Sequence, residues 1–303
     1  MKKKIITLCL GLFLIVGLSG CGGNESKESE GKVGFSISTL NNPFFVSMKD
    51  AADAKAKEVN LTLEVLDAKD DAAKQVSDIE ALINKDIKVL LVNPVDSKAI
   101  APSIKAAQAK GIKVITLDRT AEGVSVDTHI ASDNVAGGKM AAEYMVSKLK
   151  ANDKVIELQG IPGASAAIDR GQGFDDAVKG KLDIVAKQTA NFDRAQGLSV
   201  MENLAQANPG FKGVFAQNDE MIMGALQAIS DKEVITVGFD GTDDALQAIK
   251  DGKLDATVIQ QPDKIGALGM ENAAKLIKGE AIEKTIPVDL VLVTSENVAD
   301  FLK

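Results

Sequence analysis

The chain has 303 residues, of which 45% are hydrophobic and 26% are charged, and this length suffices for one large or two medium-sized domains. Its formal net charge is −8 at pH 7. A nucleic-acid partner is not expected, because phosphate binding would require Lys and Arg clustered on a basic face and the sequence shows no such cluster.

Residues 1–20 have the pattern of a signal peptide. "MKKK" is positively charged, "IITLCLGLFLIVGL" is a short apolar segment, and "LSGC" brings small residues up to Cys21. This pattern resembles the lipobox of bacterial lipoproteins, which implies cleavage before Cys21 and a lipid on its sulfur. The alternative is a plain signal peptide or an uncleaved anchor. Loss of residues 1–20, which hold three Lys and no acidic residue, would change the net charge from −8 to −11.

The cysteine content fits an exported chain without disulfides. The only other cysteine, Cys9, would leave with the signal peptide, so the mature chain must be stabilised by core burial alone. Residues 21–31 are small, polar and charged, and they are expected to form a flexible tether between the lipid and the folded part.

From residue 32 onward, short Val/Ile/Leu-rich runs alternate with Ala- and Lys-rich stretches. This alternation predicts parallel sheets covered by helices on both faces. Ten such units exceed one comfortable sheet, so we expect an α/β fold with two Rossmann-like, doubly wound lobes. Strands are predicted at 32–39, 61–68, 88–94, 113–118, 128–133, 154–160, 182–189, 213–218, 234–240 and 256–260. Helices are predicted at 43–58, 72–85, 97–110, 134–150, 164–179, 193–207, 219–229, 242–251 and 263–278.

Polar residues gather where the predicted strands end, which is where ligands bind in open α/β sheets. Most of them are Asn, Asp, Gln or Arg, whose side chains form forked hydrogen bonds. No Gly-rich phosphate loop or P-loop lysine occurs at any strand end. The residues at these ends, or in the helix that follows, are Asn41, Asn42, Asn93, Asp118, Arg119, Gln159, Arg170, Asn218, Asp219, Asp240 and Gln260.

The charges in this set favour a neutral ligand. Asp118 and Asp240 balance Arg119 and Arg170, and buried charges can compensate one another in this way. A site of this kind suits a polyhydroxyl compound, whereas a phosphate would require net positive charge. Aromatic rings can contact the C–H faces of a sugar, and Phe44, Phe45 and Phe192 are candidates for such walls.

Each residue also has a simpler interpretation. Asn42 before Pro43 is typical of a helix cap with proline in the first turn. Phe44 and Phe45 are adjacent, so they cannot both face one core stripe of a helix, and one of them should lie near solvent or a cleft. Arg119 and Arg170 could be solvated surface residues.

Ten strings, taken in order, resemble the D-ribose-binding proteins of bacterial ABC importers. They include "STLNNPFF", "VITLDR", "SAAIDRGQGF", "FAQNDEM" and "VGFDGT", and the resemblance runs from Val33 to Val293. It implies two lobes joined by a three-segment hinge, with an N-terminal lobe of 32–132 plus 261–289 and a C-terminal lobe of 133–260 plus 290–303. Pro162 and Ile168 depart from the family pattern without removing a binding group.

The resemblance also implies the roles of the site residues. Hydrogen bonds to the sugar are expected from Asn42, Asp118, Arg119, Arg170, Asn218, Asp240 and Gln260. Phe44, Phe45, Phe192 and Phe239 are expected to form aromatic walls, and Asn93 and Ser132 to lie behind them or at the rim. No catalytic residue, metal or cofactor is expected.

The implied function is capture of D-ribose outside the membrane, closure of the lobes and delivery to an ABC permease by a monomer anchored through Cys21 to the outer face of the cell membrane. Another small neutral sugar, such as allose, galactose or a furanose signal, stays an alternative, as does a sugar-sensing lipoprotein. An exported sugar-modifying enzyme is disfavoured, because each carboxylate would lie beside an Arg or in a hydrogen-bonded shell and lack a general-acid role. The sole histidine, His129, is expected to be structural.

Overall fold

The structure is a computed structural model that describes residues 31–231 and 233–302. The predicted signal peptide, the lipidated Cys21 and the tether up to residue 30 lie outside the described residues. Within the described part, no helix combines the length and apolar character needed to cross a bilayer.

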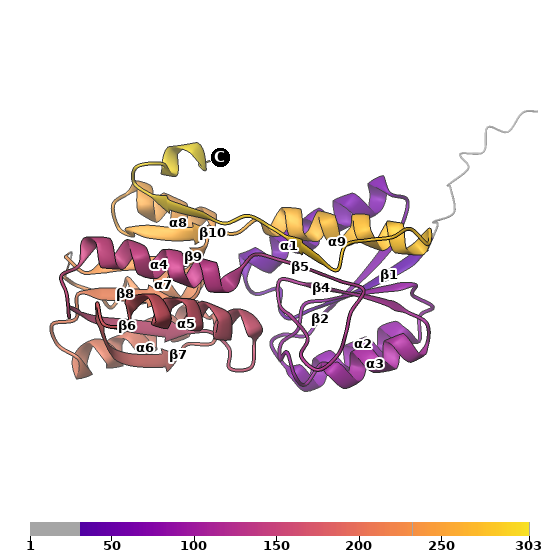
Figure 1. The fold of residues 1–303 in the computed structure, drawn as a ribbon, viewed down its shortest axis with the longest axis horizontal. Coiled ribbons are helices and arrows are strands. Elements are labelled where there is room, and N and C mark those ends of the chain that lie inside the picture. The colour runs from indigo at the N-terminus through magenta and orange to yellow at the C-terminus, as the bar shows by residue number, and fades with distance from the viewer. Residues whose placement is uncertain (1–30, 232, 303) are drawn as a thin grey trace, which may run out of the picture.

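Two six-stranded sheets form the centres of two lobes that lie end to end (Figure 1). The first sheet has the order β11-β5-β4-β3-β1-β2 and is parallel throughout. The second has the order β12-β10-β9-β8-β6-β7 and is parallel except for β12, which pairs antiparallel with β10. This arrangement confirms the predicted α/β fold with two doubly wound lobes.

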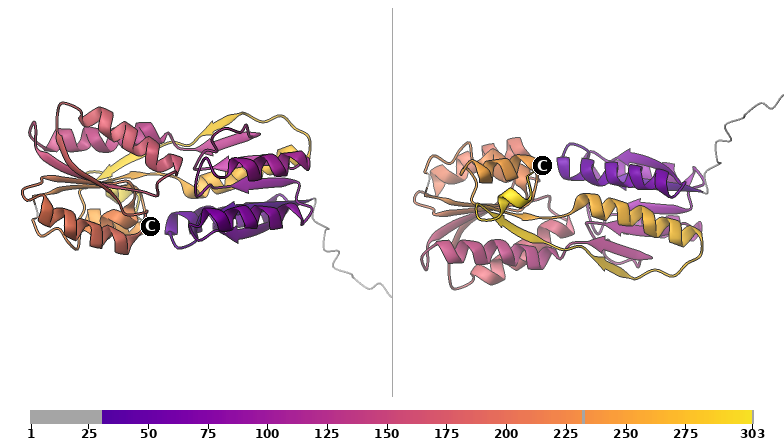
Figure 2. Two further views of the ribbon diagram at one scale, coloured as in Figure 1. Left: turned by 90° about the horizontal axis from the view of Figure 1, so that it is seen from below. Right: turned by 90° about the horizontal axis from the view of Figure 1, so that it is seen from above.

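The N-terminal lobe contains β1 (Lys32–Ile37), β2 (Thr62–Asp67), β3 (Val89–Val92), β4 (Lys113–Leu117), β5 (Thr128–Ala131) and β11 (Thr285–Pro287). Its helices are α1 (Pro43–Glu58), α2 (Ala72–Ile83), α3 (Ala101–Ala109) and α9 (Pro262–Ile277). Helices α1 and α9 enclose one apolar core against the sheet, and α2 and α3 enclose another on the opposite face (Figure 2).

The C-terminal lobe contains β6 (Lys154–Gln159), β7 (Asp183–Thr189), β8 (Gly213–Ala216), β9 (Ile235–Asp240), β10 (Ala256–Ile259) and β12 (Val291–Thr294). Its helices are α4 (Asn134–Lys148), α5 (Ser165–Val178), α6 (Arg194–Ala207), α7 (Asp219–Ala225), α8 (Asp243–Lys250) and the short 3₁₀ helix η1 (Val298–Asp300). Helices α4 and α5 cover one face, and α6, α7 and α8 cover the other (Figure 2).

Three connections join the lobes. They run from β5 to α4, from β10 to α9, and from β11 to β12 (Figure 1). Each lobe is therefore built from discontinuous stretches of the chain. Because β11 and α9 belong to the first lobe and β12 to the second, the chain enters and leaves both sheets more than once.

Local chemistry explains most of the element boundaries. Asn42 caps α1, because its Oδ1 accepts a hydrogen bond from the Phe44 backbone N–H at 2.9 Å, and Pro43 occupies the first turn. The predicted cap is thus confirmed. Helix α3 begins at Ala101 and not at 97, since Pro102 has no N–H to donate to the carbonyl four residues earlier. Helix α7 ends at Ala225, where the hydrogen bonds tighten to the i→i−3 pattern.

Candidate ligand-binding site

The strand ends of both lobes converge on a cavity between the two sheets. The N-terminal lobe supplies the start of α1 and the loop after β4, and the C-terminal lobe supplies α5 and the ends of β7 to β10. The side chains pack closely here and leave a cavity volume of about 10 Å³, roughly the minimum that one water needs. The cavity is lined by Asn42, Phe44, Asp118, Arg119, Ala166, Arg170, Phe192, Asn218, Asp240 and Gln260.

On the N-terminal side, Asp118 and Arg119 follow β4 and are almost fully buried. Arg119 Nε lies 3.7 Å from Asp118 Oδ2, and Arg119 Nη1 donates to the Pro94 carbonyl at 3.0 Å. The guanidinium also lies over the rings of Phe45 and Phe192, at 5.1 and 5.3 Å from their centroids. Burial lowers the pKa of Arg119, and the Asp118 carboxylate opposes this effect. Contact with the rings of Phe45 and Phe192 orients the Arg119 guanidinium.

On the C-terminal side, α5 presents Arg170 to the cavity. Its Nε donates to Asn134 Oδ1 at 2.9 Å and its Nη1 donates to the Gln217 carbonyl at 2.6 Å. The guanidinium stacks over Phe239 at 3.8 Å. Its Nη1 lies 3.7 Å from Asp240 Oδ1. Arg170 is thus held by three elements before any ligand contact is made.

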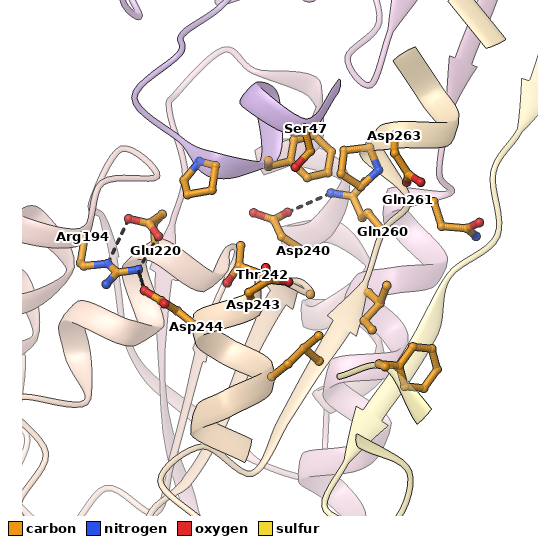
Figure 3. Close-up of a pocket in the computed structure, with 17 residues that line it drawn as sticks. Ser47, Arg194, Glu220, Asp240, Thr242, Asp243, Asp244, Gln260, Gln261 and Asp263 are labelled. Atoms are coloured by element: carbon orange, nitrogen blue, oxygen red, sulfur yellow. Dashed lines mark hydrogen bonds and ion pairs between the residues drawn. The ribbon is translucent and has the colours of Figure 1, made fainter. Parts of the chain in front are cut away.

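Asp240 and Gln260 form a pair at the ends of the adjacent strands β9 and β10. Gln260 Nε2 donates to Asp240 Oδ1 at 2.9 Å (Figure 3). Burial raises the pKa of Asp240 well above its usual value, while Arg170 and the Gln260 hydrogen bond act in the opposite direction. The site therefore holds two carboxyl groups and two guanidinium groups in an enclosed space, with no net charge when all four are ionised.

Several polar atoms at the site have no hydrogen-bond partner within the described part of the chain. They are Asp118 Oδ1, Arg119 Nε and Gln260 Oε1. Buried polar side-chain atoms normally have a partner, so acceptors and donors left open in one place are typical of a site where a ligand binds. Because both kinds occur, that ligand should both donate and accept hydrogen bonds, as hydroxyl groups do.

Three residues that line the cavity also have an unusual backbone conformation. Asp118, Phe192 and Asp240 have positive φ angles of 63°, 59° and 126°. Such conformations cost a non-glycine residue on the order of 1–3 kcal/mol and are found preferentially at functional sites. At Asp118 and Asp240 this conformation occurs where a strand ends and its last carboxylate enters the lining of the cavity.

The predicted site residues divide into two groups. All seven residues predicted to hydrogen-bond the ligand line the cavity, as do Phe44 and Phe192. Phe45 and Phe239 lie behind the two arginines instead. Phe44 and Phe45 are both buried, with their rings perpendicular and 5.1 Å apart, and Phe44 is the one on the cavity.

Asn93 and Ser132 do not line the cavity. Asn93 is fully buried beneath Asp118, and its Nδ2 donates to Asp118 Oδ2 at 3.2 Å. Sequence reasoning missed Ala166, which lines the cavity from the first turn of α5. An alanine carries no chemical signal, and only its position four residues before Arg170, on the same helix face, could have indicated it.

The two lobes touch directly beside the cavity. The Ser97 N–H donates to the Gly163 carbonyl at 3.0 Å, and the Ser165 N–H donates to Ser97 Oγ at 3.1 Å. The Thr120 N–H in turn donates to Ser165 Oγ at 2.9 Å. These three bonds, which we call the lobe contact, join the loops after β3 and β4 to the start of α5. The structure is therefore a closed arrangement of the lobes.

A wider groove lies next to the cavity and shares three of its lining residues: Phe44, Asp240 and Gln260. Figure 3 shows its acidic side, where Arg194 is held by Glu220 at 2.6 Å and by Asp244 at 2.8 Å. The described residues contain no cluster of three His, Cys, Asp or Glu that could hold a metal ion. Asp240 and Gln260 therefore line both the cavity and the groove.

Comparison with known proteins places the chain in a family. Residues 33–281 match the model of the periplasmic binding protein domain. This chain belongs to the periplasmic binding protein family. It is 47% identical to the ribose import binding protein RbsB of Bacillus subtilis (strain 168), over 98% of this chain and 100% of the relative.

Two further relatives are more distant. The D-allose-binding periplasmic protein of Escherichia coli (strain K12) is 31% identical over 84% of this chain and 86% of its own length. The crystal structure of an ABC transporter solute-binding protein from Mycobacterium smegmatis, with bound glycerol, superposes with a TM-score of 0.86 at 38% identity, over 90% of this chain and 97% of that one. Periplasmic binding proteins of ABC importers are exported and are not enzymes, and the same holds for this chain.

Proposed function

We propose that this periplasmic binding protein captures D-ribose in the cavity between its lobes and delivers it to an ABC permease. The observation that carries the proposal is the set of open hydrogen-bonding atoms on Asp118, Arg119 and Gln260, three residues that line the cavity between the two lobes. The 47% identity to a ribose import binding protein, against 31% to an allose-binding one, favours ribose within this class.

The proposed roles follow from the chemistry of each side chain. Asp118 and Asp240 accept hydrogen bonds from sugar hydroxyls, and Arg119 and Arg170 donate them. Asn42, Asn218 and Gln260 can do both. Phe44 and Phe192 contact the C–H faces of the ring, while Phe45 and Phe239 support the arginines from behind.

Hinge motion is part of the proposal. The lobes 32–132 plus 261–289 and 133–260 plus 290–303 would move about the three connections and close on the sugar. A ligand shifts such an equilibrium only by its differential affinity for the two states, and here it contacts both lobes only when they are closed. We also propose that a lipid on Cys21 anchors the chain at the outer face of the membrane.

Calorimetry with the mature protein tests the ligand. D-ribose should bind more tightly than D-allose, D-galactose and the other pentoses and hexoses of a panel, and the sugar should be recovered unchanged. If allose or another sugar bound more tightly than ribose, the ribose proposal would be wrong, and the alternative of a different small neutral sugar would replace it.

The site assignment has its own test. Truncation of one partner of a buried, charge-assisted network costs about 2–5 kcal/mol, so Asp118→Ala and Arg119→Ala should each weaken ribose binding at least about tenfold while circular dichroism stays that of the folded chain. Asp183→Ala, at the exposed start of β7, serves as the control and should bind normally. Unchanged affinity in Asp118→Ala or Arg119→Ala would contradict the assignment.

A further inference from the structure

Asp219, the first residue of α7, is fully buried and does not line the cavity. Its Oδ2 accepts hydrogen bonds from the backbone N–H of Gly241 at 2.8 Å and of Thr242 at 2.7 Å, and from Thr242 Oγ1 at 3.2 Å. Its Oδ1 accepts from Thr257 Oγ1 at 2.7 Å. One carboxylate thus joins α7, the loop after β9, and β10.

The loop that Asp219 holds begins immediately after Asp240. Asp240 has a φ of 126°, which is strained for a residue other than glycine, and Gly241 has a φ of 80°, which glycine adopts readily. A strained backbone persists only when its surroundings determine it. The two N–H groups bound by Asp219 belong to the next two peptide groups, which are the ones that set the direction of the chain after Asp240.

The space around the Asp219 carboxylate and the loop after Asp240 has no room for further side-chain atoms. A Cβ atom at Gly238, on β9, would lie 2.3 Å from Asp219 Oδ1, so the carboxylate occupies the space that a side chain would take. A Cβ atom at Gly241 would lie 2.4 Å from Ile259 Cγ1. The loop is therefore confined on the side of β10 as well.

Asp219 also follows Asn218 directly in the chain. Asn218 caps α7 through its Oδ1, which accepts from the Met221 N–H at 2.9 Å, and its Nδ2 donates to the Phe192 carbonyl at 3.2 Å. Asn218, which precedes Asp219, and Asp240, which precedes the loop that Asp219 holds, both line the cavity. Asp219 thus fixes the distance between two strand ends that face the ligand.

We infer that Asp219 is a positioning residue for sugar binding, which holds the backbone after Asp240 so that the Asp240 carboxylate faces Arg170 and Gln260 in the cavity. The inference rests on the proposed sugar site, because it acts through Asp240. It assigns a ligand-affinity role to a side chain that cannot touch the sugar.

The test is calorimetry of ribose binding at pH 7 with Asp219→Asn. The amide has the same size but only one oxygen, so it cannot accept both from the loop N–H groups and from Thr257 Oγ1 as the carboxylate does. We expect at least tenfold weaker binding. Asp176→Asn, an exposed change on α5 in the same lobe, is the matched control and should leave the affinity unchanged.

A double-mutant cycle separates positioning from a general structural effect. If Asp219 acts through Asp240, Asp219→Asn should weaken binding less than about twofold further in an Asp240→Asn background. An equal loss in both backgrounds would overturn the inference, as would wild-type affinity in Asp219→Asn. Wild-type affinity in Asp240→Asn would instead contradict the proposed sugar site, and the inference with it.

A milder variant covers the case in which Asp219→Asn does not fold. Thr257→Val is isosteric and removes only the hydrogen bond to Asp219 Oδ1, on the side away from the loop. We expect a folded protein with ribose binding weakened severalfold. If Asp219→Asn is unfolded, the inference is overturned when Thr257→Val folds and binds ribose like the wild type.

Discussion

Single side chains hold the strand ends of this cavity in place before a ligand arrives. Asn93 is the clearest case in the N-terminal lobe. Its Oδ1 accepts from the Ser38 N–H at 3.3 Å, and its Nδ2 donates to the Leu117 carbonyl at 3.1 Å and to Asp118 Oδ2. One amide therefore links the end of β1 to the end of β4 and orients the Asp118 carboxylate. Asn93 and Asp219 perform comparable tasks in the two lobes.

Replacement of Asn93 by alanine should weaken both folding and binding. The change removes the hydrogen bond to the Ser38 N–H, and the Leu117 carbonyl keeps only the one from the Arg119 N–H. Loss of a buried partner costs about 1–3 kcal/mol. Urea unfolding should show a loss of this size, and calorimetry should show weaker ribose binding. Asn203→Ala, at an exposed position of α6, should change neither. Normal ribose affinity in Asn93→Ala would show that the Asp118 carboxylate needs no support from Asn93.

The residue types at the strand ends could be predicted because Asn, Asp, Gln and Arg are unusual after buried strands. Which of these residues line the cavity and which lie behind it could not be predicted. Asp219 stands beside Asn218 in the sequence and looks like an ordinary acidic residue at a helix start, and only the fold brings it to a loop 22 residues later. Phe45 and Phe44 are likewise adjacent, and the sequence does not tell which ring meets the cavity and which supports Arg119.

At the scale of elements, close helix packing sets the position of Arg170. Helices α4 and α5 approach so closely that a Cβ atom at Gly138 would lie 2.1 Å from the Arg170 carbonyl oxygen, and one at Gly173 would lie 2.0 Å from the Val135 carbonyl oxygen. Glycine is required at both positions because backbone lies against backbone. The same contact brings Asn134, the first residue of α4, to Arg170 Nε.

Gly138→Ala should therefore disturb the site from a distance. The added methyl group forces α4 and α5 apart, and overpacking of this kind costs about 1–3 kcal/mol. Thermal unfolding should occur at a lower temperature, and ribose binding should weaken because Arg170 moves with α5. Ser147→Ala, on the exposed face of α4, is the control. A Gly138→Ala protein with unchanged affinity would show that Arg170 keeps its place without this contact.

The long helices and the parallel strands could be predicted because each carries a strong pattern. The boundaries of α1 were predicted to the residue, since a cap and a proline mark its start. Strands β11 and β12 were not predicted. They have three and four residues and are mostly only partly buried, and β11 ends in Pro287, so neither shows the apolar run of a central strand.

At the scale of the whole molecule, the lobe contact closes the cavity without any ligand atom. Its three hydrogen bonds involve Ser97, Thr120, Gly163 and Ser165. Each intramolecular hydrogen bond contributes about 0.5–1.5 kcal/mol net. The lobe contact therefore contributes free energy to closure in addition to the contacts of the sugar. We expect this contribution to raise the affinity for ribose.

Ser165→Ala should shift the lobes toward the open form. The change removes the acceptor for the Thr120 N–H, and loss of one hydrogen bond should weaken ribose binding by about two- to tenfold. X-ray scattering without sugar should show a larger radius of gyration than for the wild type, while urea unfolding stays nearly unchanged. Ser199→Ala, exposed on α6, is the matched control. Identical scattering and affinity in Ser165→Ala would mean that the lobe contact does not influence closure.

The interleaving of the chain through both lobes has a consequence for the order in which the molecule can form. Helix α9 completes the apolar core against α1, and β11 completes the first sheet, yet both follow nearly the whole second lobe in the chain. The second sheet is likewise complete only when β12 has paired with β10. A growing chain that has reached only residue 260 contains neither lobe in full. Each sheet therefore gains its last strand only after residue 284, and α9, β11 and β12, which complete the two lobes, all lie within residues 262–294.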